Sequence, residues 1–393
     1  MADEIVILGG ARTPMAEYNG VLRGYTEIEL GAIAARAALE RTGVAEKDVD
    51  HVVFGNAMQA SGNAVYGARH VGLRAGIPDT VPALTVNRLC GSGIQSVINA
   101  AQMIRLGEAD TVLAGGMESM SQAPFVIRGI RSGLRMGHAD LQDSLLVSLR
   151  DDFSGCYMAE TAVNLAREKG ISREEQDRFA LRSQKAAEAA YREGKFQEEI
   201  VPIKIQEKKK EFLFREDDHR RPDTTLEALA KLAPAFSREG TVTAGNASGI
   251  VDGGAAVLVE SSSRAAARKR TPLGRIVSWG IAGVDPRIMG IGPVPASRMA
   301  LSKAGLTLKD IDLIEVNEAF AGQYLAVEKE LGLDRDRVNV NGGAIALGHP
   351  LGATGTRLIL TALLELRRRQ GHFALATACI GGGQGIAIIL EAI

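Results

Sequence analysis

The feature that most constrains the fold of this chain is a sequence pattern that occurs twice. Residues 43–54 and residues 305–316 each read as the end of a helix, a loop and an apolar strand. A Lys-Asp-x-Asp sequence begins at Lys47 in the first copy and at Lys309 in the second, an offset of 262 residues (309 − 47). Short matches arise by chance, so the segments around each copy must also agree in order.

The neighbouring segments do agree in order. Each copy is followed by a short strand, a glycine-containing turn, a helix and a second strand. The strands are predicted at 85–87 and 111–114 after the first copy and at 339–341 and 374–378 after the second, with helices ending near Gly107 and Gly371 and with an earlier strand at 5–8 and helix at 27–41. Alternating strands and helices are typical of α/β units with mostly parallel sheets. The sequence therefore predicts an α/β fold of two similar halves around one central site.

An insert separates the two halves, which we predict at residues 1–118 and 250–393. Residues 119–249 differ in composition from both halves. They contain polar loops, two predicted helices and a densely charged stretch, at 159–167, 173–192 and 204–221. We interpret Lys208 to Lys210 as a solvated turn. An insert of this length usually carries substrate recognition or subunit contacts.

The composition narrows the classes of protein. The 393 residues are 46% apolar, and 46 Lys and Arg stand against 47 Asp and Glu, so no basic excess favours nucleic acid or an anionic membrane. Three cysteines in so long a chain indicate a reducing compartment without a disulfide framework, and their spacing fits no zinc pattern. The start is acidic, unlike a signal peptide, and no apolar run reaches the ~18 residues that span a bilayer. We therefore expect a soluble, cytoplasmic protein.

Cys90 lies where a predicted strand meets a predicted helix. It follows the strand-like Val86, and Gly91 and Gly93 make the turn permissive. The unpaired N–H groups and the positive end of the helix should favour the thiolate and lower the pKa of Cys90. A backbone N–H could also hold an oxyanion there. The alternative is that Cys90 is a small apolar residue buried in a tight turn.

Three further loops carry polar side chains next to predicted elements. Asn317 follows a strand, His349 lies in a Gly-His-Pro turn that leads into a helix, and Cys379 ends the last core strand. A single His would be read as structural. Together with Cys90, these residues indicate covalent acyl chemistry, because a histidine can keep a thiol deprotonated and a second cysteine can move a proton at carbon. Such chemistry requires no metal and no redox cofactor.

The segments around these four residues resemble the signatures of the thiolase family, in the family's order and across essentially the whole chain. The Thr-Ala-Gly-Asn-Ala-Ser-Gly segment at residues 243–249 matches as well. The resemblance implies a five-layer αβαβα fold of two similar halves with an inserted loop domain. It also implies a homo-oligomer, usually a dimer or a tetramer, and the polar, glycine-containing stretch at 122–138 is a candidate assembly loop.

The resemblance implies a role for each site residue. Cys90 is the acylated nucleophile, His349 is the base that activates it, and Cys379 is the acid/base at the α-carbon of the second acyl unit. His349 and a water held by Asn317 form one oxyanion hole. The backbone N–H groups of Cys90 and Gly381 form the other.

The implied substrates are coenzyme A and its acyl thioesters, with no prosthetic group. The coenzyme contacts implied by the resemblance are Arg221, Leu232, Phe236, Ala244 and Ser248. The residues of the acyl pocket implied by the resemblance are Met158, Met289, Ala319 and Phe320. For Met158 and for Met289, simple packing in the hydrophobic core is an equally good explanation.

The implied activity is that of an acetyl-CoA C-acetyltransferase, which condenses two acetyl-CoA reversibly to acetoacetyl-CoA and CoA by a ping-pong route. A degradative 3-ketoacyl-CoA thiolase with a broader chain-length range is the closest alternative. A carrier-protein ketosynthase shares the doubled fold but typically has a second His where this chain has Cys379. A non-enzymatic acyl-CoA-binding or lipid-binding protein would have no reason to keep the two cysteines and the histidine together. Three departures from the family pattern leave the acyl preference open: Tyr157, Val251 and Ala228.

Overall fold

The computed structural model describes residues 3–207, 210–235 and 239–393. The strands are β1 (Ile5–Arg12), β2 (Ala16–Glu17), β3 (His51–Gly55), β4 (Ala83–Val86), β5 (Thr111–Glu118), β6 (Phe125–Val126), β7 (Gln142–Asp143), β8 (Arg150–Asp151), β9 (Cys156–Tyr157), β10 (Ile203–Glu207), β11 (Lys210–Phe214), β12 (Val251–Ser261), β13 (Gly274–Gly283), β14 (Leu313–Val316), β15 (Phe373–Ile380) and β16 (Gln384–Ala392). The α-helices are α1 (Glu27–Thr42), α2 (Gly67–Arg74), α3 (Ser92–Arg105), α4 (Ser144–Ser148), α5 (Met158–Lys169), α6 (Arg173–Arg192), α7 (Leu226–Ala230), α8 (Ser262–Ala267), α9 (Pro293–Ala304), α10 (Ala321–Leu331), α11 (Ala344–Leu347) and α12 (Leu351–Arg369).

Two halves of the chain repeat one topology. In the first, β5 pairs in parallel with β3 and antiparallel with β12, and β12 pairs antiparallel with β1. In the second, β15 pairs in parallel with β14 and antiparallel with β16, and β16 pairs antiparallel with β13. Helices α1 and α3 of the first half correspond in chain order to α9 and α12 of the second. The prediction of two similar α/β halves is confirmed.

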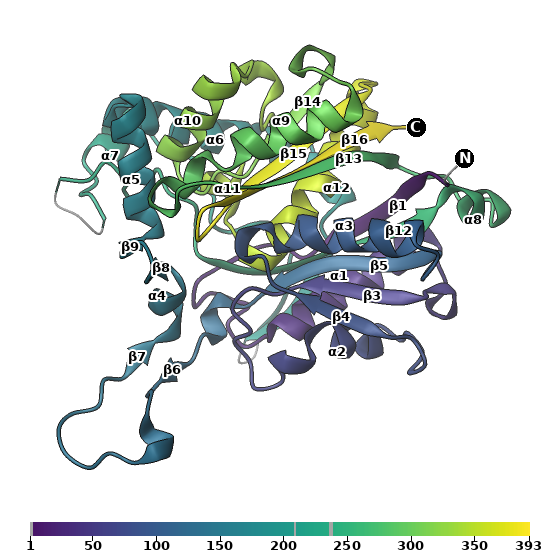
Figure 1. Ribbon diagram of the computed structural model, residues 1–393, viewed down its shortest axis with the longest axis horizontal. Helices are drawn as coiled ribbons and strands as arrows, with labels where there is room; N and C mark the ends of the chain where they lie inside the picture. Colours follow the sequence, from purple (N-terminus) through teal and green to yellow (C-terminus); the bar gives the residue numbers. More distant parts are fainter. Residues whose placement is uncertain (1–2, 208–209, 236–238) are drawn as a thin grey trace.

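The fold has five layers, in the order helices, sheet, helices, sheet, helices, with α3 and α12 in the central layer (Figure 1). Three apolar cores hold these layers together. The central core joins side chains of α3 and α12 to the inner faces of both sheets. A second core lies under α1 and α2, and a third lies under α9 and α10. Helix α12 is buried on every side from Leu351 to Leu366, as expected for a helix that is packed between two sheets. The predicted αβαβα architecture is therefore present.

Two strands run further than the sequence predicts, because their glycines lie within them. The predicted ends of β1 and β5 were Leu8 and Ala114, but both strands continue through a Gly-Gly pair. A Cβ on Gly10 would overlap the carbonyl oxygen of Ala256 on β12, and one on Gly116 would overlap that of Gly352 on α12. These glycines allow close backbone packing and do not end the strands.

The prediction of a strand at residues 339–341 is wrong. Only Val338 forms a β-bridge, with Ile314 on β14, and Asn339 then turns the chain with a positive φ of 45°. The Asn339 side chain replaces the missing ladder, because its Oδ1 accepts from the Val316 N–H (2.8 Å) and its Nδ2 donates to the Val316 carbonyl (2.9 Å). Asn tolerates this backbone region and competes for backbone hydrogen bonds.

Strand β12 places the boundary between the halves later than predicted. Its residues pair with β1 on one side and with β5 on the other, so it belongs to the sheet of the first half although it follows residue 250. Among the described residues, strand pairing joins the two sheets at two positions, Val6 with Arg275 and Ile7 with Gly274. We propose that the second half begins after α8, and we keep 119–249 as the proposed insert.

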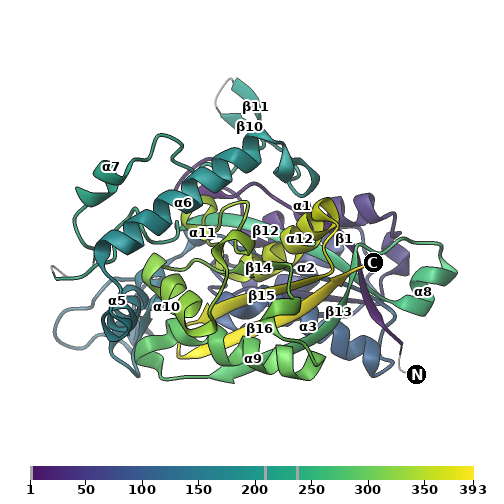
Figure 2. The same cartoon turned by 90° about the horizontal axis from the view of Figure 1, so that it is seen from above.

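The insert packs on the second half and carries two projections. Both predicted helices are present as α5 and α6, and α6 begins at a capping box between Ser172 and Glu175. Strands β10 and β11 form a hairpin beside α6 (Figure 2); of the predicted lysine turn, Lys208 and Lys209 lie outside the described residues. A thin arm between β6 and β7 extends from the body (Figure 1) and exposes apolar side chains such as Met136. In the described part of the chain, no helix is long and apolar enough to cross a membrane.

Candidate active site

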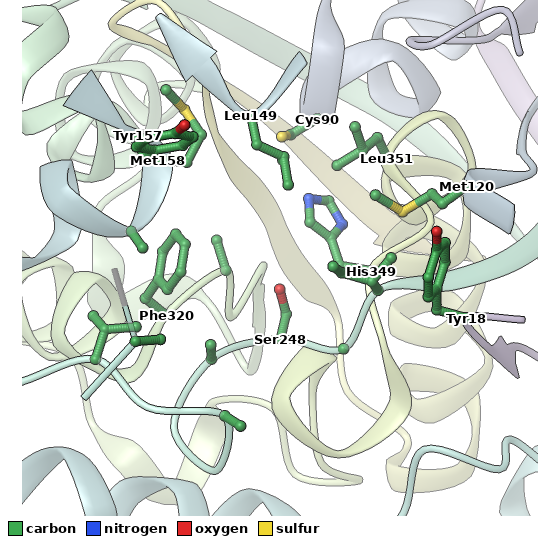
Figure 3. Close-up of a pocket in the computed structure, with 18 of the residues that line it drawn as sticks. Tyr18, Cys90, Met120, Leu149, Tyr157, Met158, Ser248, Phe320, His349 and Leu351 are labelled. Atoms are coloured by element: carbon green, nitrogen blue, oxygen red, sulfur yellow. The ribbon is translucent and has the colours of Figure 1, made fainter. Parts of the chain in front are cut away.

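A cavity of about 420 Å³ lies where the two halves and the insert meet. The Cys90 sulfur and the His349 ring point into the same space, with Ser248 on the far side of the ring (Figure 3). Most of its lining is apolar. The insert contributes Met120, Leu149, Tyr157, Met158, Ala159, His219, Ala235, Val242, Thr243, Ala244, Ala247, Ser248 and Gly249, and the halves contribute Glu17, Tyr18, Cys90, Ile250, Met289, Ala319, Phe320, His349 and Leu351.

The predicted turn at Cys90 is present and tightly held. Leu89, just before Cys90, has a positive φ of 47°, and its N–H donates to Asn87 Oδ1 (2.9 Å). A single 3-10 turn over Leu89–Gly91 then leads into α3. A Cβ on Gly91 would press into the Ile380 side chain at the end of β15, so glycine lets the Cys90 turn approach the second half.

His349 occupies the equivalent place in the second half, directly before α12. Thr354 Oγ1 donates to the Pro350 carbonyl (3.0 Å), so the same oxygen accepts from His349 Nδ1–H (2.6 Å). This assigns the tautomer in which Nε2 carries no proton. Nε2 faces the buried side chain of Asn317, whose Nδ2 lies 3.3 Å away. The imidazole is thus oriented as a base at Nε2.

Burial sets the protonation of both Cys90 and His349. Burial raises the pKa of the Cys90 thiol to about 11, against the opposing effect of the Gly381 and Cys90 N–H groups. Burial, together with the nearby Arg357 guanidinium, lowers the pKa of His349 to about 3. The predicted lowering of the Cys90 pKa by the helix end is wrong, because desolvation of the sulfur outweighs the helix and the N–H groups. The resting pair is a neutral thiol beside a neutral imidazole.

Cys379 lies behind the cavity wall. It is fully buried in β15 and packs against Met289 and Ala319, with Met158 and Phe320 beside them. Burial raises its pKa, and the Cys90 sulfur lies near enough to raise it further. The structure therefore brings the two cysteines close together.

Asn317 and Gly381 complete the inner site. Asn317 follows β14 and is fully buried, and its Oδ1 has no hydrogen-bond partner among the described residues. Gly381 follows β15, and its N–H faces the Cys90 sulfur closely enough to favour the thiolate. A Cβ on Gly381 would be 3.2 Å from Met158 Sδ, so glycine keeps this N–H accessible beside the acyl side of the cavity.

A second, outer cavity of about 660 Å³ adjoins the first. Its lining includes Arg221, Leu232 and Ala228, and both cavities are lined by Glu17, His219 and Ala244. The Arg221 side chain is 59% exposed and forms an ion pair with Glu17. The sequence-predicted coenzyme residues thus lie along one path into the inner cavity. Phe236 lies outside the described residues.

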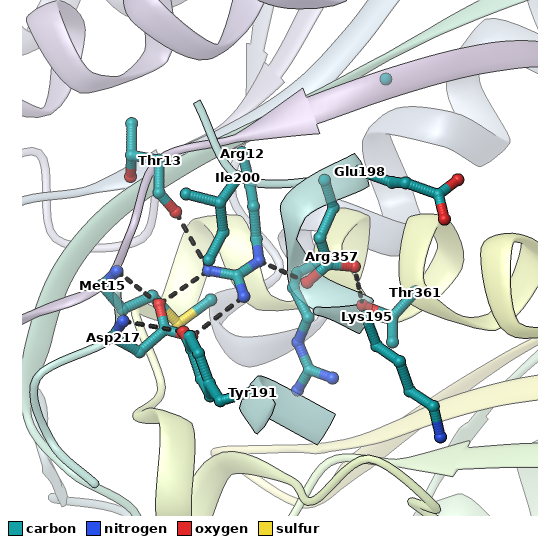
Figure 4. A network of polar contacts seen from close by, with 12 residues as sticks. Arg12, Thr13, Met15, Tyr191, Lys195, Glu198, Ile200, Asp217, Arg357 and Thr361 are labelled. Atoms are coloured by element: carbon teal, nitrogen blue, oxygen red, sulfur yellow. Dashed lines mark hydrogen bonds and ion pairs between the residues drawn. The ribbon is translucent and has the colours of Figure 1, made fainter. Parts of the chain in front are cut away.

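A buried charge network holds the loop that presents Arg221 (Figure 4). Arg12 of β1 is fully buried and bonds Asp217 through both terminal nitrogens (2.7 and 2.9 Å). Its Nε donates to Glu199 Oε1 (2.7 Å), and Tyr191 OH donates to Asp217 Oδ2 (2.7 Å). The first half is thereby tied to the insert four residues before Arg221.

Comparison with known proteins agrees with this arrangement. The thiolase N-terminal domain model matches residues 5–263, and the thiolase C-terminal domain model matches residues 270–392. The chain belongs to the thiolase family. The thiolase boundary between 263 and 270 also agrees with the membership of β12 in the first half.

The relatives divide between two enzyme names. The human mitochondrial 3-ketoacyl-CoA thiolase is 53% identical over 388 residues, covering 98% of each chain. An acetyl-CoA acetyltransferase of Pseudomonas aeruginosa is 52% identical over 389 residues, covering 98% of this chain and 99% of the relative. The crystal structure of the human enzyme in complex with CoA superposes with a TM-score of 0.97 at 52% identity, covering 100% of this chain and 98% of the other.

Sequence reasoning missed several residues of this thiolase site. Leu149 and Met120 line the cavity, and Glu118 is a buried carboxyl near Cys90. No local signal marked Glu118, because Gly115 and Gly116 before it lie inside β5 and pack against other backbone segments. Of the three departures, Val251 packs against Gly348 beside the His349 turn, where a Cβ on Gly348 would meet it at 2.5 Å. Tyr157 lines the cavity before α5, and the structure assigns Ala228 only to the outer cavity.

Alkylation of Cys90 by iodoacetamide should become faster with pH, by about tenfold per unit between pH 7 and pH 10. The thiolate is the reacting form, and a pKa of about 11 keeps the thiolate fraction rising across this range. The rate is measured by mass spectrometry of the Cys90 peptide. A Cys156→Ala control should give the same profile. A plateau below pH 8 would mean that Cys90 and His349 form an ion pair.

Arg221→Ala should raise KM for acyl-CoA by about 3- to 10-fold and leave kcat nearly unchanged, because an exposed charge contact contributes roughly 1 kcal/mol. A pantetheine thioester without the nucleotide should show no such change. Arg215→Ala, an exposed arginine six residues earlier, is the matched control. Equal loss with both substrates would assign Arg221 a structural role.

Proposed function

We propose that this thiolase catalyses the reversible Claisen condensation of two acetyl-CoA to acetoacetyl-CoA and CoA through an acyl group on Cys90. One observation carries the proposal: Cys90 and His349 precede equivalent helices of the two halves and face one apolar cavity, with Cys379 directly behind it. Coenzyme A is proposed to enter by the outer cavity along Arg221, Leu232, Ala244 and Ser248. The human relative that was crystallised with CoA supports that part.

In the first half-reaction, the Cys90 sulfur attacks the thioester carbon and its proton passes to His349 Nε2. The carbonyl oxygen becomes an oxyanion, for which the Cys90 and Gly381 N–H groups are the proposed donors. The bond between the carbonyl carbon and the coenzyme sulfur then breaks. Cys379 donates its proton to the departing sulfur and becomes a thiolate. Burial raises the pKa of Cys379, so the resting group is a thiol that still carries this proton.

In the second half-reaction, the Cys379 thiolate removes a proton from the methyl group of the next acetyl-CoA. The carbanion attacks the acyl carbon on Cys90, so that a C–C bond forms and the C–S bond to Cys90 breaks. The Cys90 sulfur recovers its proton from His349. For the enolate oxygen of the second acetyl-CoA, we propose stabilisation by His349 and a water on Asn317, whose Oδ1 has no hydrogen-bond partner among the described residues. Both cysteines end as thiols, so the cycle balances.

Cys379→Ala should still become acetylated at Cys90, though more slowly, because a coenzyme thiolate can leave without the proton of Cys379. Turnover should fall by about 10²- to 10⁴-fold, the contribution of a positioned acid/base, since no base remains for the methyl proton. Acetylation is followed by mass spectrometry after brief exposure to acetyl-CoA, and turnover is followed by acetoacetyl-CoA cleavage with CoA. Circular dichroism checks the fold, and Cys156→Ala should be active. Loss of acetylation in a folded variant would mean that Cys379 is needed to form the acyl-enzyme. Turnover near wild type would reduce Cys379 to a packing residue.

A second candidate is thiolysis of 3-ketoacyl-CoA over a broader range of chain lengths. The observation that favours it is the acyl side of the cavity, where Leu149, Met158 and Phe320 offer more apolar surface than a methyl group requires. The name of the human relative supports the same reading. The two candidates share every chemical step and differ only in the length of the acyl chain.

The chain-length series separates them. For condensation of acetyl units, kcat/KM for thiolysis should fall at least about tenfold from a C4 to a C8 3-ketoacyl-CoA, since each badly placed methylene costs ~1 kcal/mol or more. Leu149→Ala should then raise kcat/KM for the C8 substrate relative to kcat/KM for the C4 substrate. Leu146→Ala, an exposed residue of α4, is the matched control. A flat or rising series in the wild type would establish the broader enzyme.

We also propose a cytoplasmic homo-oligomer, a dimer or a tetramer. Exposed apolar residues of the arm support the assembly, among them Phe125, Ile130, Leu134 and Met136. Strand β4 ends the sheet of the first half and so presents an unpaired edge.

A further inference from the structure

Glu118 is a buried carboxyl at the end of β5 that receives four N–H donors. Its Oε1 accepts from Asn56 Nδ2 (2.8 Å) and from the Met58 N–H (3.0 Å). Its Oε2 accepts from the Ala57 N–H (3.1 Å) and from the Gly352 N–H (2.8 Å). An ionised carboxylate offers only acceptors, so this set of partners complements the charged form. One side chain thus joins three segments of the chain.

The joined segments are two walls around Cys90. Ala57 and Met58, which follow β3, pack with Cys90 against one apolar cluster, and that cluster includes Leu351 at the start of α12. Gly352 directly follows Leu351 and lies three residues after His349. Glu118 therefore fixes the wall that carries His349 relative to the wall that confines the Cys90 thiol.

The charge of Glu118 is costly at this position. Burial raises the pKa of Glu118 to about 7, the backbone N–H groups of Met58, Ala57 and Gly352 lower it, and the carboxyl of Glu27 on α1 raises it. The Glu118 carboxylate in turn raises the pKa of Cys90. An apolar side chain would fill the space without opposing the nucleophile, so packing alone does not explain an acid here.

We propose that Glu118 is a positioning residue for acyl transfer, whose carboxylate holds the start of α12 and residues 56–58 in register so that His349 can take the proton of Cys90. The proposal rests on the proposed function. Glu118 touches no substrate in this scheme. Its effect runs through backbone N–H groups on either side of the reacting atoms.

Glu118→Gln tests the charge. The amide keeps the size but has one acceptor oxygen, so two of the four N–H donors face an NH₂ group and the link between the two walls is weakened. We expect kcat to fall about 100-fold with KM for acyl-CoA within about threefold, because a misplacement of about 1 Å in a reacting pair costs that much. The alkylation profile of Cys90 should shift to lower pH at the same time, since the carboxylate that opposes the thiolate is gone. A more reactive thiol in a slower enzyme is a combination that simple destabilisation does not produce.

Glu118→Asp tests whether the length of the side chain matters. It also tests the proposal if Glu118→Gln fails to fold. It keeps the charge but is one methylene shorter, so it cannot span both walls. We expect slower turnover with the alkylation profile of the wild type. Glu260→Gln is the matched control, because Glu260 is fully buried and bonds Thr111 at the opposite end of β5, about 23 Å away. It should lose stability without a change in kcat or in the profile.

Acetylation of the wild type separates the failure of this inference from that of the proposed function. If the wild type is not acetylated at Cys90 by acetyl-CoA, the proposed function fails. If it is acetylated, and Glu118→Gln or Glu118→Asp forms the acyl-enzyme at the wild-type rate, the inference is overturned. Behaviour of both Glu118 variants that matches Glu260→Gln would likewise leave Glu118 with a structural role only.

Discussion

The close backbone approach of α3, α12 and β5 is the constraint on which the rest of the structure depends. A Cβ on Gly93 or on Gly355 would overlap the other central helix, and a Cβ on Gly116 would overlap the carbonyl of Gly352. Because three glycines remove these side chains, the first turns of both helices lie against each other between the two sheets. The residues that precede those turns, Cys90 and His349, are then neighbours by construction.

The second consequence of this packing is that the reacting groups are buried. Burial between the two sheets and the insert desolvates the three reacting groups, and each therefore takes its neutral form: Cys90 and Cys379 as thiols and His349 as the free base. Chemistry in such a place begins with proton transfer between neutral partners and creates charge only when a substrate oxygen is present to receive hydrogen bonds. Glu118 differs from these three groups, because its four N–H donors stabilise a buried carboxylate.

Much of the fold followed from the sequence, because hydrophobic periodicity and the repeat at an offset of 262 residues reflect packing directly. The errors came from side chains that replace backbone and from glycines that serve packing. Asn339 imitates a strand partner, and Gly116 lies inside a strand, and neither role has a local signature. The electrostatics of Cys90 also escaped prediction, because burial depends on which distant segments cover the sulfur. Glu118 was missed for the same reason: its four partners come from segments far apart in the chain.

The position of the insert has a consequence for how such proteins can change. Glu118 ends β5 and pairs with Gly253 on β12, so the whole insert is, in topological terms, the loop of one β-hairpin. The entropy of closing a loop grows only with the logarithm of its length, about 0.6 kcal/mol for each doubling. Segments that line the acyl and coenzyme sides of the cavity can therefore be lengthened, shortened or exchanged at small thermodynamic cost. The paired strands and the two central helices keep the reacting groups in place throughout. Changes in the insert can therefore alter the range of substrates while the chemistry stays the same.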